Sequence, residues 1–511
     1  MIGYQFLIEV DVEDAAGVEE TLRYCCAPQY TGGVYTWEPR IIDPGLFSVS
    51  LFTGGKTTGP SRCSYGEVVL GNFMPFETGV GPIDSLKTKK FYGRAIRMWY
   101  GLPSAVFPGQ FTKAYEAIVD TPVFSWNSVT LPIKGKQADL DTPLDTGKFL
   151  GTNTLPLGIE GGTELKDRIK PFLLGRAFNF SPILCNSAKL IYAASPLSGL
   201  SVDELNSNIK VYDNGVELSF KGIKADLENF APPAASFYAS AAGYIRLGST
   251  PAGAVTMTAA SKGLALTSKP ANLIEKLLTL QGKEVYINAA SFTDHNVNDG
   301  WERGIFLSSA MNISTIFDNL LAPLGYWYFD HDGKIILGQL QDPQYMIPSL
   351  SLFGDTNIKS FTIKKSLDTK GGAPASKVTV RYAKNYTVSA NPAASVSVER
   401  KLKLSEAWSQ STVDAPPENI QPISEEMIID SLCTNENTSH NYLLSQFYCY
   451  ERSLIEVEVT QEMFLACAVL LPGICISIDL KGRFGYNDTP MLLIGTTINY
   501  VEESVRFTLW G

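Results

Sequence analysis

The sequence predicts a mainly β, multi-domain protein with barrel or sandwich domains and an inserted α/β domain. Short runs in which apolar and polar residues alternate recur along most of the chain, with Gly or Pro between them, as in strands joined by turns. Residues 269–345 differ, because their apolar residues recur at helical spacing. The length of 511 residues is compatible with about three or four domains.

The first predicted domain, residues 1–162, is β throughout. Its most regular stretch runs from Trp37 to Gly101, where alternating segments are separated by Gly and Pro. Further strands are expected at Phe6–Val12, Glu20–Cys25, Phe111–Val119 and Val129–Ile133. Many short strands at regular spacing favour a barrel or a sandwich.

Residues 163–268 are predicted to form a second β-rich domain. The clearest element is a hairpin over 209–218, because Asn214-Gly215 supplies the positive φ angles that a tight turn needs. The segment 170–179 and the alternation around 244–247 fit this β assignment.

Residues 269–345 are predicted as the α/β domain. Leu273, Ile274, Leu277 and Leu278 share one helical face. A second helix is expected over 313–321, with Asn312 as its N-cap and Pro323 and Gly325 ending it. Two aromatic-rich strands then flank a turn at Asp330-His331-Asp332-Gly333.

Residues 346–511 are predicted to return to β. Residues 388–422 are expected to form a long loop or arm, and short helices are expected over 424–432 and 441–450. Strands are expected over the following ranges: 377–382, 454–459, 474–480, 492–500 and 504–510.

The composition excludes several classes of protein. A net charge of −10 without a basic run argues against DNA binding. The N-terminus alternates like a strand and does not resemble a signal peptide, and the apolar window Met463–Ile476 is broken by Pro472-Gly473, so no membrane span is expected. The chain is expected to be soluble and made in a cytoplasm.

The cysteines and histidines give no metal site. The eight cysteines are scattered without a C-x-x-C pair, and reduced, buried side chains are the favoured interpretation. A zinc or iron–sulfur site assembled from distant cysteines is the less favoured alternative. Only three histidines are present, which disfavours zinc catalysis.

Four motifs invite a catalytic interpretation, and each has a simpler one. Thr53-Gly54-Gly55-Lys56-Thr57 lacks the first glycine and the helix of a phosphate loop, so a hairpin loop is expected. Asp330-His331-Asp332-Gly333 is expected to be a turn rather than a metal or acid–base cluster.

The other two motifs concern carboxylates. An Asp–His pair such as Asp294-His295 can act as a general base, but a solvated loop over 294–299 is the favoured interpretation. The paired carboxylates Glu425-Glu426, Glu456/Glu458 and Glu502-Glu503 could suggest a glycosidase, but such pairs mean little without a cleft. Glu456 and Glu458 fit the solvent-facing side of a strand, and Glu425-Glu426 fits a helix N-terminus. No catalytic, cofactor-binding or metal-binding residue is predicted, and the chain is not expected to be an enzyme.

The order of several short motifs resembles the tail-tip or baseplate hub proteins of long-tailed bacteriophages and gene transfer agents. The matching motifs in the first half are Pro44-Gly45-x-Phe47, Ser64–Asn72, Gly93-Arg94-x-Ile96, Lys170–Gly175 and Asn179-Phe180-Ser181-Pro182. Those in the second half are Pro323–Trp327, Gly338-x-Leu340-x-Asp342-Pro343, Lys377–Tyr386, Leu470–Gly473 and Leu509-Trp510-Gly511. Each motif is short, and the resemblance rests on their order along most of the chain.

The resemblance implies a homotrimer around the tail axis, with two tube-like β domains per chain that adapt a six-fold tube to a three-fold tip. The implied partners are the distal tail protein, the tail tube, the tape measure protein and a central fibre or tip protein. The implied location is the virion, after assembly in the host cytoplasm. Some relatives carry a fused peptidase or lysozyme domain or an iron–sulfur cluster, and this sequence has no matching segment.

Two other functions stay open from the sequence. A cell-wall-degrading glycosidase or peptidase would need a cleft with convergent groups near Asp294, His295 and Asp299. A receptor-binding adhesin would need exposed aromatic residues at one tip and direct binding to host cells.

Overall fold

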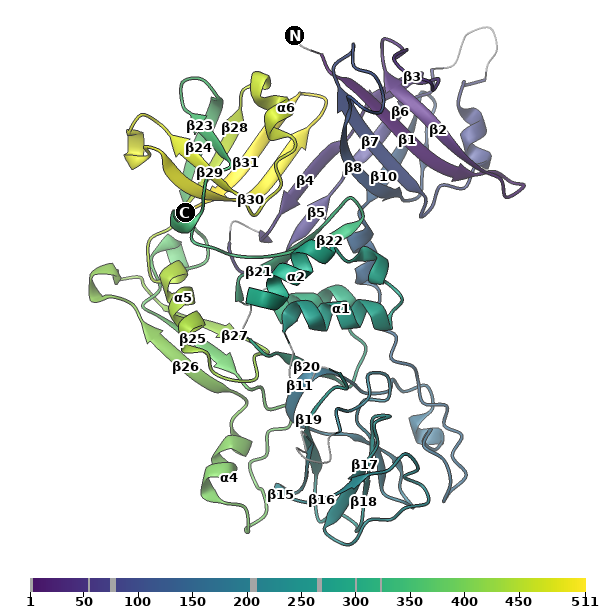
Figure 1. Ribbon diagram of the computed structural model, residues 1–511, viewed down its shortest axis with the longest axis vertical. Coiled ribbons are helices and arrows are strands. Elements are labelled where there is room, and N and C mark those ends of the chain that lie inside the picture. Colours follow the sequence, from purple (N-terminus) through teal and green to yellow (C-terminus); the bar gives the residue numbers. More distant parts are fainter. Residues whose placement is uncertain are drawn as a thin grey trace. The chain divides into compact units, whose positions relative to one another are not determined.

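The computed structural model describes residues 3–53, 56–73, 80–202, 209–263, 269–298, 301–321 and 324–511 (Figure 1). The chain forms two compact units, each assembled from separated segments. Unit 1 comprises Met1–Asp139, Gly325–Gly372 and Glu451–Gly511, and unit 2 comprises Leu140–Leu324 and Ala373–Tyr450. The four smaller domains expected from the sequence (1–162, 163–268, 269–345 and 346–511) remain a prediction.

Unit 1 contains a closed β-barrel. Its strands follow the order β6-β3-β2-β1-β7-β8-β10, and the pairing of β10 with β6 closes the ring of seven. The strands are β1 (Gln5–Glu13), β2 (Glu19–Cys26), β3 (Glu38–Asp43), β6 (Glu67–Gly71), β7 (Ala95–Gly101), β8 (Thr112–Val119) and β10 (Ser128–Lys134), with β9 (Val123–Phe124) beside β10. The mainly β prediction, including a barrel, is confirmed.

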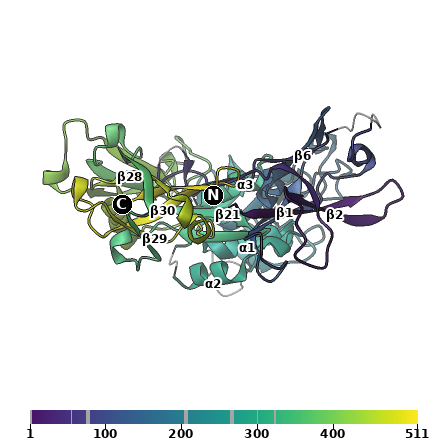
Figure 2. The ribbon, with the colours of Figure 1, turned by 90° about the horizontal axis from the view of Figure 1, so that it is seen from above.

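Alternation along the strands separates the inside of the barrel from the outside. In β1, Ile8, Val10 and Val12 are fully buried, whereas Glu9 and Asp11 between them are partly exposed. Ile8 lies opposite the buried Met98 of β7, and Figure 2 shows β1 beside β2, its other neighbour. The period of two thus directs the apolar set inward and the charged set outward.

Unit 1 also contains a second sheet, of eight strands. Its main path is β23-β29-β30-β31-β28-β24, and β4 joins it by pairing with β30 and carrying β5 on its other edge. The strands are β4 (Leu46–Ser50), β5 (Arg62–Ser64), β23 (Leu350–Phe353), β24 (Ile358–Lys365), β28 (Ser453–Val459), β29 (Cys475–Asp479), β30 (Thr489–Asn499) and β31 (Ser504–Trp510). Part of the Trp37–Gly101 stretch therefore belongs to a sheet made mostly from the end of the chain.

Unit 1 also contains the hairpin of β21 (Tyr326–His331) and β22 (Lys334–Gln339) and the short helix α6 (Phe464–Cys467). Asp332 and Gly333 have φ angles of 52° and 69°, as a tight two-residue turn requires. The predicted hairpin is confirmed.

Unit 2 contains two five-stranded sheets and a three-stranded sheet. Their orders are β15-β14-β19-β11-β20, β12-β13-β18-β17-β16 and β26-β25-β27. The strands are β11 (Phe172–Phe180), β12 (Ile183–Asn186), β13 (Ile191–Ala193), β14 (Lys210–Asp213), β15 (Val216–Glu217), β16 (Ser219–Ile223), β17 (Ser236–Ala239), β18 (Tyr244–Leu247), β19 (Val255–Ala260), β20 (Gly304–Leu307), β25 (Lys377–Tyr382), β26 (Ser409–Asp414) and β27 (Glu426–Asp430). A core that includes Phe180, Phe237 and Met257 joins strands of the two larger sheets.

Five α-helices accompany these sheets in the part of unit 2 that the structure describes. They are α1 (Pro270–Leu280), α2 (Ala289–Asn298), α3 (Ile313–Leu321), α4 (Val398–Ser405) and α5 (Thr438–Tyr448). The apolar faces predicted for α1 and α3 are buried, and the helix expected over 441–450 is present as α5. The hairpin turn at Asn214-Gly215 is also confirmed, with φ angles of 45° and 86°.

Two secondary-structure predictions within residues 346–511 were wrong. The helix expected over 424–432 is the strand β27, which pairs in parallel with β25. The loop or arm expected over 388–422 contains the helix α4 and the strand β26. Pro323, expected to end α3, lies outside the described residues.

Candidate functional site

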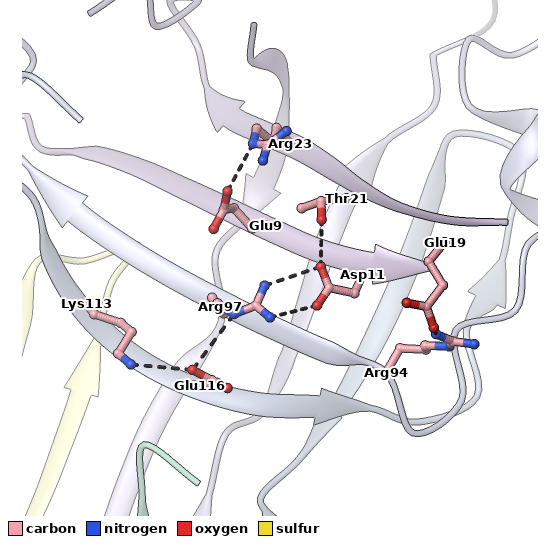
Figure 3. Close-up of polar contacts among 9 residues, drawn as sticks. All are labelled: Glu9, Asp11, Glu19, Thr21, Arg23, Arg94, Arg97, Lys113 and Glu116. Carbon is pink, nitrogen blue, oxygen red and sulfur yellow. Dashed lines mark hydrogen bonds and ion pairs between the residues drawn. The ribbon is translucent and has the colours of Figure 1, made fainter. Parts of the chain in front are cut away.

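Charged side chains form a ladder across four neighbouring strands on the outer face of the barrel (Figure 3). Arg97 of β7 donates two hydrogen bonds to Asp11 of β1, at 2.7 and 3.3 Å, and Thr21 of β2 donates a third at 2.8 Å. Arg23 of β2 lies 3.0 Å from Glu9 of β1. The ladder forms because alternation places these residues on the same face of adjacent strands.

The ladder continues onto β8 and reaches the hairpin. Glu116 lies 3.8 Å from Arg97 and 3.4 Å from Lys113, and Lys113 also pairs with Asp332 of the β21–β22 turn at 3.2 Å. Arg94 pairs with both Glu13 and Glu19. The outer face is therefore charged but satisfied by its own pairs, which suits a rigid wall better than a catalytic cleft.

The environment of Asp11 lowers the pKa of its carboxyl group. Partial burial opposes ionisation, but the hydrogen bonds from Arg97 and Thr21 and the positive charge of Arg97 outweigh it. The stability from this ion pair is therefore present above the ordinary pKa of an aspartate, near 4, and is lost as the pH falls through the lowered value.

We expect Arg97→Ala to lower the free energy of unfolding at pH 7 by about 1–2 kcal/mol, because it removes a bidentate, partly buried ion pair. Urea unfolding at pH 7 and pH 3 tests this, with Arg62→Ala as a control on an exposed strand residue. A loss of the same size at pH 3, which lies below the ordinary pKa of an aspartate, would contradict the electrostatic explanation.

The residues of the proposed general base do not converge. Asp294 and His295 lie in helix α2, not in the solvated loop expected, and Asp299 lies outside the described residues. Asp294 is exposed and His295 is half-exposed. Consecutive helical residues point about 100° apart, so this pair does not aim at one substrate atom.

The acidic pairs are bound to cations. Glu456 lies 2.7 Å from Lys364, and Glu458 pairs with Lys359 and with Arg506. The solvent-facing position predicted in β28 is confirmed for Glu456, whereas Lys359 and Arg506 cover Glu458 and leave its side chain 12% exposed. Glu426 lies in β27 and not at a helix N-terminus, so that interpretation of the pair Glu425-Glu426 was wrong.

The phosphate-loop motif has a structural role. The N–H and the hydroxyl of Thr57, which is fully buried, donate to Asp368 at 2.7 and 2.8 Å. Lys56 is exposed, and Gly54 and Gly55 lie outside the described residues. The N–H and the hydroxyl of Thr57, which would bind a phosphate in a phosphate loop, therefore bind the Asp368 carboxylate instead.

The part of the chain that the structure describes contains no group of three or more His, Cys, Asp or Glu residues able to hold a metal ion. All eight cysteines are free thiols, and six of them are buried. None of the described helices is long and apolar enough to cross a membrane.

A buried histidine in unit 2 lies outside any motif found in the sequence. His440 of α5 is 7% exposed, and its ring centroid lies 4.2 Å from that of Trp301. Burial and the nearby positive charge of Arg303 lower the pKa of His440 to about 3. Its neutral form is therefore part of the core.

We expect unit 2 to lose stability as the pH falls. Unfolded histidine binds a proton near pH 6.5, whereas folded His440 does so near pH 3, so the unfolded state gains protons between these values. The loss is roughly 1.4 kcal/mol per pH unit in that window. Urea unfolding of the wild type and His440→Gln at pH 7, 6, 5 and 4 measures it. The variant is expected to lose this slope, and parallel pH profiles would contradict the assignment.

Comparisons with known proteins give structural neighbours only. No family model matches the sequence, and no curated protein matches it. A tail protein from Neisseria meningitidis is similar at 10% identity and a TM-score of 0.35, over 100% of this chain and 97% of that chain. A prophage tail protein from Listeria monocytogenes is similar at 9% identity and a TM-score of 0.35, over 99% and 94%.

A chain from the virion of a gene transfer agent particle is similar at 10% identity and a TM-score of 0.36, over 72% of this chain and 91% of that chain. TM-scores this far below 0.5 establish no relationship. The functional proposal therefore rests on the sequence and geometry of the chain itself.

Proposed function

We propose that the chain is a structural virion protein that forms the central hub of a phage tail tip or baseplate. In this role it links the tail tube to the central fibre or tip. The order of short motifs from Pro44 to Gly511 supports the family. A fold class alone does not imply a function, so the proposal is argued from specific features of this chain.

The observation that carries the proposal is the pair of large β structures in unit 1. One is the closed barrel, and the other is the eight-stranded sheet built mainly from the C-terminal part of the chain. Three copies of a chain with two such structures present six around an axis. This arrangement would match a six-fold tube to a three-fold tip.

The charged ladder fits the same role. Pairs such as Arg97–Asp11 and Lys113–Asp332 hold the barrel wall and the β21–β22 hairpin in fixed positions within the chain. A hub must transmit load between neighbours rather than open and close around a substrate. The proposed neighbours are other copies of the chain, the distal tail protein, the tail tube, the tape measure protein and the central fibre or tip.

Counting copies in a cryo-electron microscopy reconstruction of the particle that contains this chain tests the proposal. Three copies around the tail axis, in contact with tube and tip, are expected. Six copies or a single copy would contradict the hub. The mass of the purified chain in solution offers a second readout, and a trimer is expected.

The rival function is a wall-degrading enzyme that acts without a hub role. A turbidity assay with purified peptidoglycan separates the two, using the wild type and the Asp294→Ala/His295→Ala double variant. No lysis by either protein is expected. Lysis by the wild type that the double variant abolishes would contradict a purely structural role.

A further inference from the structure

A cavity of about 270 Å³ in unit 2 is not explained by the hub role. It lies where the end of β11 and Thr258 of β19 meet the segment that contains Asn385, α4 and the start of β26. Backbone contacts fix this junction, since the N–H of Tyr386 donates to the carbonyl of Phe178. Its volume is near the lower end of the range for ligand pockets, about 300 Å³, and suits one small polar ligand.

One cation that lines the cavity and one beside it lack an acidic partner within the described residues. Arg400, which lines it, has its guanidinium 3.7 Å from the centre of the Tyr212 ring and donates its Nε–H to the carbonyl of Gly215 at 3.2 Å. Lys384 lies over the ring of Trp408, another lining residue, at 5.3 Å. Neither cation forms an ion pair within the described part of this chain, whose net charge is −10.

These two cations are placed for an anion. An arginine held flat on an aromatic ring keeps its terminal N–H groups in a fixed plane, which suits a carboxylate or a phosphate. Lys403, on the same helix, differs because it pairs with Glu399 at 3.2 Å. Among the lining residues, Arg400 is therefore the cation without an acidic partner, whereas Lys384 lies beside the cavity over the lining Trp408. The exposed side chain of Glu406 also lines the cavity.

Asn179 provides an acceptor at the same cavity. It is 6% exposed, and its Nδ2 group donates to Asn385 Oδ1 at 2.9 Å and to the carbonyl of Thr387 at 2.6 Å. These bonds fix the orientation of the amide, and within the described residues its buried Oδ1 atom receives no hydrogen bond. A buried acceptor without a donor costs about 1–3 kcal/mol, so a ligand hydroxyl would stabilise it.

We propose that this cavity binds a sugar unit that carries an acidic group. The carboxylate or phosphate binds Arg400, the apolar face of the sugar ring packs on the half-exposed ring of Trp408, and a hydroxyl donates to Asn179 Oδ1. A free anion would bind Arg400 but would leave the indole ring of Trp408 and the amide oxygen of Asn179 without partners. This inference does not depend on the hub role.

Two matched pairs of sugars test the proposal: galacturonic acid against galactose, and glucose 6-phosphate against glucose. Saturation-transfer NMR and calorimetry with the full chain measure binding. At least one acidic sugar is expected to bind about tenfold more tightly than its neutral partner, as a charge-assisted bond implies. Acetate and inorganic phosphate serve as free anions and are expected to bind more weakly than the acidic sugars.

Three variants assign the site. Arg400→Gln is expected to weaken the acidic sugar about tenfold and leave the neutral one unchanged, whereas Trp408→Ala is expected to weaken both. Lys401→Gln is the control on the same helix, because its ammonium group donates to the carbonyl of Ala394 and it does not line the cavity. It is expected to bind like the wild type.

Several results would overturn the proposal. They are no binding of any of the four sugars, equal affinity for acidic and neutral partners, free anions that bind as tightly as the acidic sugars, or wild-type affinity in Arg400→Gln. Circular dichroism checks that each variant is folded. If Arg400→Gln is unfolded, Arg400→Lys replaces it, because it keeps the charge, loses the planar fork and should weaken the acidic sugar alone.

Discussion

Val49→Pro is expected to lower the free energy of unfolding of unit 1 by about 4 kcal/mol. Val49 is 1% exposed and lies in β4, between Thr496 of β30 on one side and Cys63 of β5 on the other. Because β4 has a partner strand on both edges, proline removes a ladder hydrogen bond that no solvent molecule can replace. The buried side chain also loses its packing.

Urea unfolding and hydrogen exchange measure this effect separately. Exchange should increase in the peptides that cover 46–52 and 489–499, since the N–H of Leu51 donates to the carbonyl of Ile494 across the same pair of strands. Val49→Ala is the control, because it keeps the backbone donor and is expected to cost about 2 kcal/mol. Equal losses in the two variants would show that β4 does not pair with β30.

The position of β4 illustrates what the sequence could predict. Alternation identified the strands of the barrel and those near the C-terminus, because the period of two is a local property that burial of one face imposes. The partner of a strand is not local. Ser50 lies opposite Gly495, more than 400 residues away in the sequence, and no pattern within either segment specifies that pairing.

The wrong predictions have similar causes. The segment around Glu426–Asp430 has acidic residues before a run of three apolar residues, as a helix start can have, but its parallel pairing with β25 decides its structure. Helix α4 was missed because Leu404 is its only buried residue, while Val398 is exposed. The helix is amphipathic but poor in apolar residues, and the Pro, Ala and Ser residues of 388–422 favoured a loop from the sequence alone.

The candidate ligand site could be recognised only from the fold. Asn179 and Asn385 each occur in a short motif of the family resemblance, yet nothing in the sequence brings them together. The structure places their side-chain amides 2.9 Å apart. Asn179 has a φ angle of 50°, which asparagine tolerates better than most residues. The residue type is therefore consistent with the local backbone, but it does not indicate a ligand site.

Close approach of two strands in unit 2 leads to the last prediction. Gly304 of β20 lies opposite Gly175 of β11. A Cβ atom on Gly304 would lie 2.0 Å from the carbonyl oxygen of Arg176 and 2.3 Å from its nitrogen, and one on Gly175 would lie 2.1 Å from the carbonyl oxygen of Arg303. These are backbone atoms in a sheet, so they cannot turn aside as a flexible side chain can.

Gly304→Ala is therefore expected to lower the free energy of unfolding of unit 2 by about 3 kcal/mol or more, because the two strands must separate to admit the methyl group. Gly109→Ala is the matched control, since a Cβ atom there meets nothing within 4 Å, and it is expected to change stability by less than about 0.5 kcal/mol. Urea unfolding measures both variants.

The pairing of β11 with β20 continues into Arg303, whose guanidinium donates to the carbonyl of Leu320 in α3. A forced separation at Gly304 should therefore also increase hydrogen exchange in α3, and unchanged exchange there together with wild-type stability would contradict the close pairing of these strands.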